Sequence, residues 1–254
     1  MSGAAPGWHA YPDRMALAHT LAGEIAATLA ARIAGDGRAV LAVSGGRTPE
    51  RLFAALAARP IAWERVTVTL VDERCVAESS PRSNAGLVRR HLLTGAATRA
   101  RFAPLFADEP TPEAAREAAE ARISPLPRPF AVVLLGMGED GHTASFFPGA
   151  TGLAQAMAPA GGQCVALTRA PAAVEPRLTL TLPLLIEAEH VVLHIEGEAK
   201  RTTLAAALAP GAVAEMPVRA FLRAPPRDLP SPGHPESPGH AEQRSARPPT
   251  GEAP

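Results

Sequence analysis

The chain has 254 residues with no net charge, and 46% of them are hydrophobic while only 4% are aromatic. This length suits one α/β domain or two small ones, and the even spread of arginine argues against a nucleic-acid partner. Two distant cysteines and the lack of a long apolar run exclude a zinc site, a disulfide framework and a membrane span, so we expect a cytoplasmic protein.

The first segments of the chain predict a helix, a buried strand and a second helix. Apolar residues recur every four positions over 17–33, which is typical of an amphipathic helix. Residues 39–43 follow as a short apolar strand, and Ser44-Gly-Gly46 follows as a turn. Thr48 then has the position of a helix cap, with Pro49 as the first helical residue.

The rest of the chain alternates strands with helices. We expect strands at 66–71, 130–135, 164–167 and 191–195, and helices around 87–93, at 113–122 and at 200–208. This alternation predicts a three-layer α/β fold with a mainly parallel sheet flanked by helices. Ligands bind beyond the carboxyl ends of the strands in such sheets, so polar clusters at 44–48, 72–74 and 136–142 are expected to form one site.

The end of the chain differs in composition from the rest. Residues 224–254 are rich in proline and contain few large apolar side chains. Such a segment buries too little surface to offset the entropy of ordering it. We therefore expect one α/β domain at 1–223 and a disordered tail at 224–254.

The first two polar clusters each allow two interpretations. Gly45 and Gly46, between a strand and a helix, allow backbone N–H groups to approach an anion, and Thr48 adds a hydroxyl; an ordinary turn is the alternative. Asp72 and Arg74 directly follow a strand. There the arginine either binds a phosphate or hydroxyl group, or forms a local ion pair in a solvated loop.

The stretch GMGEDGHTASFFP at 136–148 is the most specific of the three clusters. Its glycines predict a tight turn whose backbone N–H groups are candidates for binding an oxyanion. His142 follows, near the expected start of a helical turn, where the helix dipole favours the neutral imidazole and hence a general base. A capping histidine is the alternative interpretation.

Two further positions are singled out by composition. Of the 25 basic residues only Lys200 is lysine, and Asn84 is the only asparagine. Lys200 follows a strand and begins a helix, at the ligand-binding edge. Arg177 precedes a run of alternating leucine and threonine, and for both cations a solvated surface charge is the alternative.

In chain order, these motifs resemble those of the 6-phosphogluconolactonase family, which is similar in fold to glucosamine-6-phosphate isomerase. The matching runs are SGGRTP at 44–49, VDER at 71–74, SN at 83–84, GMGEDGHTASFFP at 136–148, RLTLTLP at 177–183 and GEAK at 197–200. The resemblance implies a Rossmann-like fold and hydrolysis of 6-phospho-D-glucono-1,5-lactone in the oxidative pentose phosphate pathway. It implies no metal and no organic cofactor. The expected partner is the phosphosugar lactone, and the expected state is a monomer or weak homodimer.

The resemblance also implies roles for individual residues. It implies that His142 is the general base, with Asp72 orienting either His142 or a sugar hydroxyl. It implies that Arg74 and Lys200 surround the phosphate. The remaining residues that it implies in substrate binding are Gly45, Gly46, Thr48, Asn84, Gly138, Gly141 and Arg177.

Two other functions remain as alternatives. An aminosugar-6-phosphate isomerase/deaminase shares the fold, but its family usually has an aromatic residue where Arg74 stands and an HIAFNEP-like run in place of 142–148. A non-catalytic sugar-phosphate-binding domain would not require His142. The chain departs from the lactonase family after Arg223, where family members continue into a final apolar strand, so we expect that edge strand to be missing or supplied by a partner. A frameshift would give the same appearance.

Overall fold

The computed structural model describes residues 9–171 and 174–224. The expected tail at 224–254 lies outside the described residues apart from Ala224. None of the helices in the described ranges is both long enough and apolar enough to cross a membrane.

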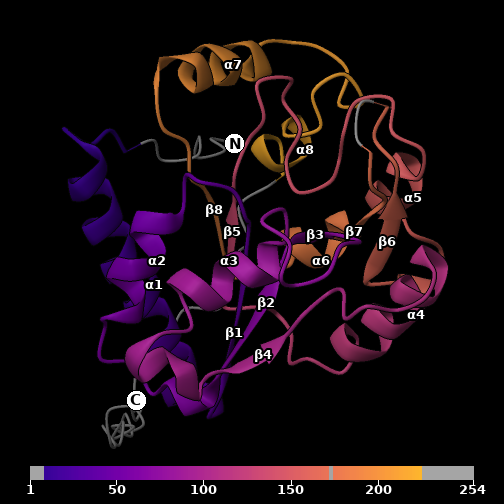
Figure 1. Ribbon diagram of the computed structural model, residues 1–254. Helices are drawn as coiled ribbons and strands as arrows, with labels where there is room; N and C mark the ends of the chain where they lie inside the picture. The colour runs from indigo at the N-terminus through magenta and orange to yellow at the C-terminus, as the bar shows by residue number, and fades with distance from the viewer. Residues whose placement is uncertain (1–8, 172–173, 225–254) are drawn as a thin grey trace, which may run out of the picture.

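Five parallel strands form the central sheet, in the order β4-β2-β1-β5-β8 (Figure 1). These strands are β1 (Ala39–Val43), β2 (Val66–Leu70), β4 (Arg101–Ala103), β5 (Val132–Leu135) and β8 (His190–Leu193). All residues of β1 and β5 are buried, as their unbroken apolar runs require in a sheet covered on both faces. The expectation of a mainly parallel sheet flanked by helices is confirmed.

A second, antiparallel sheet of three strands was not expected from the sequence. It has the order β3-β7-β6 and consists of β3 (Asp72–Arg74), β7 (Arg177–Leu180) and β6 (Val165–Thr168). The chain passes from one sheet to the other at Val71. The N–H of Val71 donates to Val43 in the central sheet, and its carbonyl accepts from Leu180 in the second sheet. The charged 72–74 cluster is therefore a short strand, not a loop.

Helices pack around both sheets. They are α1 (Arg14–Asp36), α2 (Glu50–Ala57), α3 (Asn84–His91), α4 (Pro112–Ile123), α5 (Leu153–Met157), α6 (Leu182–Ile186), α7 (Glu198–Leu208) and α8 (Arg219–Leu222), with 3₁₀ turns at Trp63–Arg65, Gly95–Arg99 and Ala160–Gly162. In Figure 1, α1, α2 and α3 gather on one side of the central sheet, and α7 lies across the end where β5 and β8 finish.

The ends of the first two helices show how the local sequence sets them. The carboxylate of Asp13 accepts the N–H groups of Met15 and Ala16 at the start of α1, and Gly37 ends that helix at a φ of 74°. The expected cap of α2 is wrong. This helix begins at Glu50, Pro49 holds the cap position, and no side chain caps it, which leaves Thr48 in the loop above the sheet.

The core is mainly aliphatic and continuous between the two sheets. One cluster of buried apolar residues includes strand residues of both, and its largest members are Trp63, Phe53, Phe130 and Phe146. β8 is an edge strand, and no other described strand pairs with its outer side. Val191 of this strand is 39% exposed, and none of the four residues of β8 is buried.

Candidate active site

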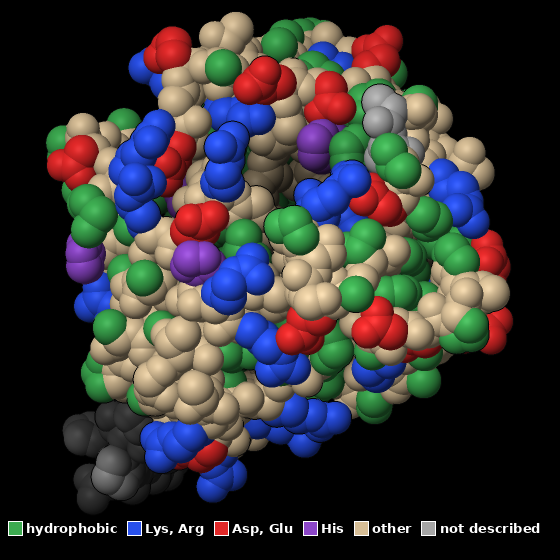
Figure 2. Space-filling model, in the orientation of Figure 1, with side chains coloured by type: hydrophobic (Ala, Val, Ile, Leu, Met, Phe, Trp, Pro, Cys, Tyr) green, Lys and Arg blue, Asp and Glu red, His purple; other side chains and the backbone are tan. Residues whose placement is uncertain are grey.

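A cavity of about 280 Å³ opens at the carboxyl ends of the central strands. Figure 2 shows the molecule hollowed below α7, with Lys and Arg side chains on both sides of the hollow. The cavity brings together ten of the eleven residues expected in the site, namely Gly45, Gly46, Thr48, Asp72, Arg74, Asn84, Gly138, His142, Arg177 and Lys200. These residues come from both sheets, so the interface of the sheets forms the site.

The loop after β1 is tied to the loop after β5 and fits closely against Asn84. Ser44 Oγ accepts the N–H of Gly136 at 3.1 Å. A Cβ atom at Gly45 would lie 1.9 Å from Asn84 Oδ1, and Gly46 has a φ of 93°. The loop therefore requires glycine at both positions: at Gly45 because Asn84 approaches closely, and at Gly46 because of its backbone conformation.

Glu73 organises the entry to α3. Its side chain is buried and accepts backbone N–H groups from Arg74 at 2.7 Å, Asn84 at 2.9 Å and Ala85 at 2.7 Å. Its second oxygen also accepts the hydroxyl of Ser83 at 3.1 Å. Burial raises the pKa of Glu73, against the lowering effect of these N–H groups. This carboxylate fixes Asn84 relative to Arg74.

Asp72 faces the cavity but does not contact His142. One of its oxygens accepts the hydroxyl of Ser145 at 2.6 Å and lies 3.8 Å from Nη1 of Arg177. Its backbone carbonyl accepts from Asn84 Nδ2 at 2.8 Å. Of the two roles that the sequence left open for Asp72, the geometry does not support orientation of His142, and the carboxylate lines the cavity where a ligand would lie.

Asp140 is the carboxylate that contacts His142. Its Oδ1 lies 2.6 Å from Nδ1 of His142 and also accepts the backbone N–H of His142 at 3.1 Å. Partial burial alone would raise the pKa of Asp140, but these contacts to His142 outweigh it and lower the pKa. A carboxylate only accepts, so Nδ1 holds the proton and Nε2 of the neutral imidazole keeps its lone pair. The signal for this contact in the sequence is the Asp-Gly-His spacing.

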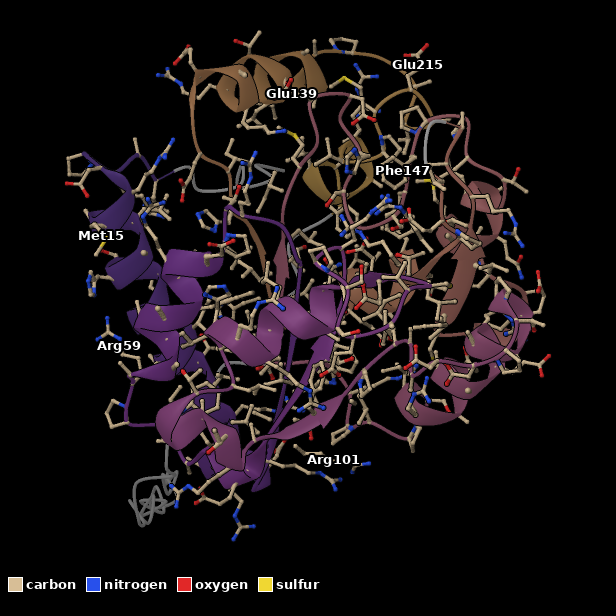
Figure 3. The ribbon with its side chains drawn as sticks, in the orientation of Figure 1. Met15, Arg59, Arg101, Glu139, Phe147 and Glu215 are labelled. Carbon is tan, nitrogen blue, oxygen red and sulfur yellow. The ribbon has the colours of Figure 1, made fainter. Side chains whose placement is uncertain are left out.

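The expected helical turn after His142 is wrong. Thr143 to Phe146 form a tight turn in which Ala144 has a φ of 48°, and the next helix is α5, which begins at Leu153. A helix dipole therefore does not act on His142. Its ring instead stacks on Phe147, labelled in Figure 3, with 4.1 Å between ring centroids. The guanidinium of Arg177 lies 4.9 Å from the same phenyl centroid, so Phe147 connects the base to the second sheet.

The glycine-rich turn mainly satisfies its own backbone groups. The N–H of Gly138 donates to the carbonyl of His142 at 2.8 Å, and the N–H of Gly141 donates to Gly138 at 3.2 Å. With the N–H of Gly136 given to Ser44, these three donors are not free for an oxyanion. Gly45, Gly46 and Met137 also line the cavity, and their N–H groups have no hydrogen-bond partner among the described residues.

Gly141 is the one expected site residue that does not line the cavity. It has a φ of 78°, and a Cβ atom there would lie 2.8 Å from the side chain of Met216. Its carbonyl accepts the N–H of Val218 at 3.0 Å. Its role is therefore to let the segment before α8 pack against the turn that contains His142.

Two arginines stand opposite each other in the second sheet. Arg74 and Arg177 are paired across β3 and β7, and the Nε atom of each is buried without a hydrogen-bond partner among the described residues. Burial lowers the pKa of Arg177, and Arg74 adds to this while Asp72 opposes it. Like charges directly opposite in a sheet are unfavourable, and an anion between them would satisfy both.

Lys200 supplies a third cation from α7. Its Nζ lies 3.9 Å from a carboxylate oxygen of Glu139, which is 73% exposed and lies next to α7 in Figure 3. An exposed carboxylate at that distance neutralises the ammonium only weakly. The cavity therefore has three cations with incomplete partners, together with one imidazole whose Nε2 is free.

Comparisons with known proteins agree on one family. Residues 12–228 match the family model described as glucosamine-6-phosphate isomerases/6-phosphogluconolactonase. A 6-phosphogluconolactonase of Mesorhizobium japonicum is 54% identical over 229 residues, covering 90% of this chain and 95% of that protein. One of Pseudomonas aeruginosa is 49% identical over 208 residues, covering 82% and 87%.

Solved structures show the same fold. A 6-phosphogluconolactonase from Shewanella baltica has a TM-score of 0.81 at 39% identity, covering 84% of this chain and 90% of that one. A monomeric glucosamine-6-phosphate deaminase has a TM-score of 0.63 at 19% identity, covering 82% and 90%, which is a likeness of fold alone.

Proposed function

Because this chain belongs to the glucosamine-6-phosphate isomerase/6-phosphogluconolactonase family, we propose that it hydrolyses 6-phospho-D-glucono-1,5-lactone to 6-phosphogluconate, with His142 as the base. The observation that supports this most is the His142–Asp140 pair, which leaves a basic Nε2 in a cavity that also holds three incompletely paired cations. Lactone hydrolysis needs both parts: a base for water and a site for a dianionic phosphate.

The cations fix the substrate through its phosphate. Arg74 and Arg177 line the cavity and donate to phosphate oxygens from guanidinium groups whose Nε atoms have no hydrogen-bond partner among the described residues, and Lys200 adds a third charge. Holding the phosphate limits the motion of the lactone ring and places C1 next to His142. Asp72 accepts a hydrogen bond from a ring hydroxyl, because its carboxylate faces the cavity and is already held by Ser145.

The chemical step follows from the state of His142. Nε2 takes a proton from a water molecule as the water oxygen bonds to C1, which gives a tetrahedral intermediate with its negative charge on the former carbonyl oxygen. The free N–H groups of Gly45, Gly46 and Met137 are the candidates to stabilise that charge. When the intermediate collapses, the bond between C1 and the ring oxygen breaks and the imidazolium returns its proton to that oxygen. Asp140 stabilises the imidazolium in between.

A direct assay tests this function. We expect the purified protein to accelerate hydrolysis of lactone freshly made by oxidising glucose 6-phosphate, after the spontaneous rate is subtracted. We expect no release of ammonia from glucosamine 6-phosphate, since the site lacks the run of residues typical of the deaminases. A folded protein that releases ammonia and leaves the lactone at its spontaneous rate would contradict the proposal.

Replacing Asp140 with asparagine tests the orientation of the base. The amide can donate to Nδ1, which would move the imidazole proton to Nε2 and leave no lone pair towards the water. We expect kcat to fall about 10²-fold with KM within about twofold, less than for a fully buried carboxylate because Asp140 is 51% exposed. Glu113→Gln, which removes an exposed carboxylate on α4, is the control. An unchanged kcat in Asp140→Asn would remove Asp140 from the mechanism.

A further inference from the structure

Glu196 places a second carboxylate in the cavity. It lies in the segment between β8 and α7, its side chain is only 10% exposed, and it lines the cavity with His194 and Lys200. A carboxylate with so little contact to water is unfavourable unless other groups satisfy its charge. Neither Glu196 nor His194 belongs to the motifs that point to the site in the sequence.

Two side chains hold this carboxylate in place. Arg14 Nε at the start of α1 lies 3.1 Å from Oε2, and His194 Nε2 lies 3.2 Å from Oε1. Burial lowers the pKa of His194, although Glu196 opposes this, so the imidazole is neutral near pH 7. Since a carboxylate only accepts, Nε2 carries the proton and donates it. The side chain of Glu196 is therefore paired with the guanidinium of Arg14 and fixed in orientation by His194.

The fixed carboxylate still has acceptor capacity. A carboxylate has about four lone-pair positions, and Arg14 and His194 use two of them. The phosphate of the substrate cannot satisfy the others, because it is itself an anion that only accepts. The lactone ring, in contrast, has hydroxyl donors at C2, C3 and C4, and these are the substrate groups whose chemistry suits Glu196.

We propose that Glu196 is a specificity-determining residue that accepts a hydrogen bond from one ring hydroxyl of the substrate. This inference rests on the proposed function, because it takes the phosphosugar lactone as the ligand. The competing explanation is that Glu196 only ties α1 to β8 through Arg14. The two explanations differ in what a variant loses: a hydroxyl contact gives selectivity among sugars, whereas a tie between elements gives stability.

The experiment compares five proteins on four substrates. The proteins are the wild type, Glu196→Ala, Glu196→Gln and Arg14→Ala, with Glu198→Gln as the control because that carboxylate is 79% exposed on α7. The substrates are the 6-phosphogluconolactone and its 2-deoxy, 3-deoxy and C4-epimeric analogues. On the parent lactone, Glu196→Ala is expected to raise KM about tenfold with kcat within twofold, and Glu196→Gln to recover part of that loss.

The pattern across substrates decides the inference. For one of the three analogues, the KM of the wild type should be raised about tenfold, as the KM of Glu196→Ala is on the parent lactone. On that analogue, Glu196→Ala should have the same KM as the wild type. Arg14→Ala, which keeps the carboxylate, should retain the same ranking of substrates. The inference would be overturned if Glu196→Ala raised KM equally on all four substrates or on none of them. It would also be overturned if Arg14→Ala fully reproduced the effect of Glu196→Ala.

Failure of the proposed function is recognised separately. It appears as a wild-type protein that does not accelerate hydrolysis of the parent lactone. In that case the dissociation constant of 6-phosphogluconate, measured by calorimetry for the wild type and Glu196→Ala, still tests the contact. Equal constants would overturn it, and a tenfold weaker constant in the variant would support it.

Discussion

Replacing His142 with alanine is expected to lower kcat for lactone hydrolysis by about 10²–10⁴-fold. In the proposed mechanism the imidazole accepts a proton at Nε2, and the carboxylate of Asp140 is hydrogen-bonded to Nδ1 of the same ring. Binding should change little, because the three cations that we propose bind the phosphate lie on β3, β7 and α7. We therefore expect the dissociation constant of 6-phosphogluconate to stay within about threefold of the wild-type value.

Turnover and binding must be measured together for this variant. Rates are taken on freshly made lactone, and product binding is taken by calorimetry on the same preparation. His190→Ala is the matched control, since His190 lies on β8 at the exposed edge of the sheet and outside the cavity. Equal loss of turnover and binding in His142→Ala would mean that the imidazole binds substrate and is not the base.

The second large effect is expected from a single methyl group at Gly138. A Cβ atom there would lie 2.1 Å from Nδ1 of His142 and 2.5 Å from Oδ1 of Asp140, far inside van der Waals contact. The methyl group must therefore displace the imidazole of His142 and the carboxylate of Asp140 from their positions. A displacement of about 1 Å at a reacting group costs on the order of 10²-fold in rate, and we expect a loss of kcat of that size.

A neighbouring glycine supplies the control for this change. A Cβ atom at Gly136, two residues earlier in the same turn, meets no atom within 4 Å, so Gly136→Ala should keep most of the activity. Thermal unfolding of both variants shows whether they are folded. Comparable activity in the two alanine variants would mean that the turn adapts freely and that the close approach at Gly138 does not position the base.

Those parts of the fold that depend on local patterns were predicted well. β1 was expected at residues 39–43 and has those bounds, because an apolar run between two glycine turns has few other conformations. The three clusters that come together at the sheet edge were also predicted, since the ends of parallel strands meet there. The shared edge explains why ten expected residues line one cavity.

The parts that depend on distant contacts were missed. β3 has three charged residues and no periodic pattern, and its partner β7 lies about a hundred positions later in the chain. The same limit applies to side-chain directions. Sequence alone does not tell which of Asp72 and Asp140 points at His142, or that Glu196 turns into the cavity. The expected helix after His142 failed for a local reason, because Ala144 adopts a left-handed conformation.

The junction at Val71 also has a consequence for the order in which the protein folds. The N–H of Val71 donates to Val43 in the central sheet, whereas its carbonyl accepts from β7 in the second sheet. One of the donors to this carbonyl is the hydroxyl of Thr179, which is 108 positions later in the chain. Closing so long a loop is entropically unfavourable until the first sheet has formed. During synthesis, the central strands β1 and β2 can therefore pair while β7 is still untranslated, and the opposed arginines meet only after it emerges. Recovery of enzymatic turnover during refolding should consequently follow, and not precede, the formation of parallel β structure.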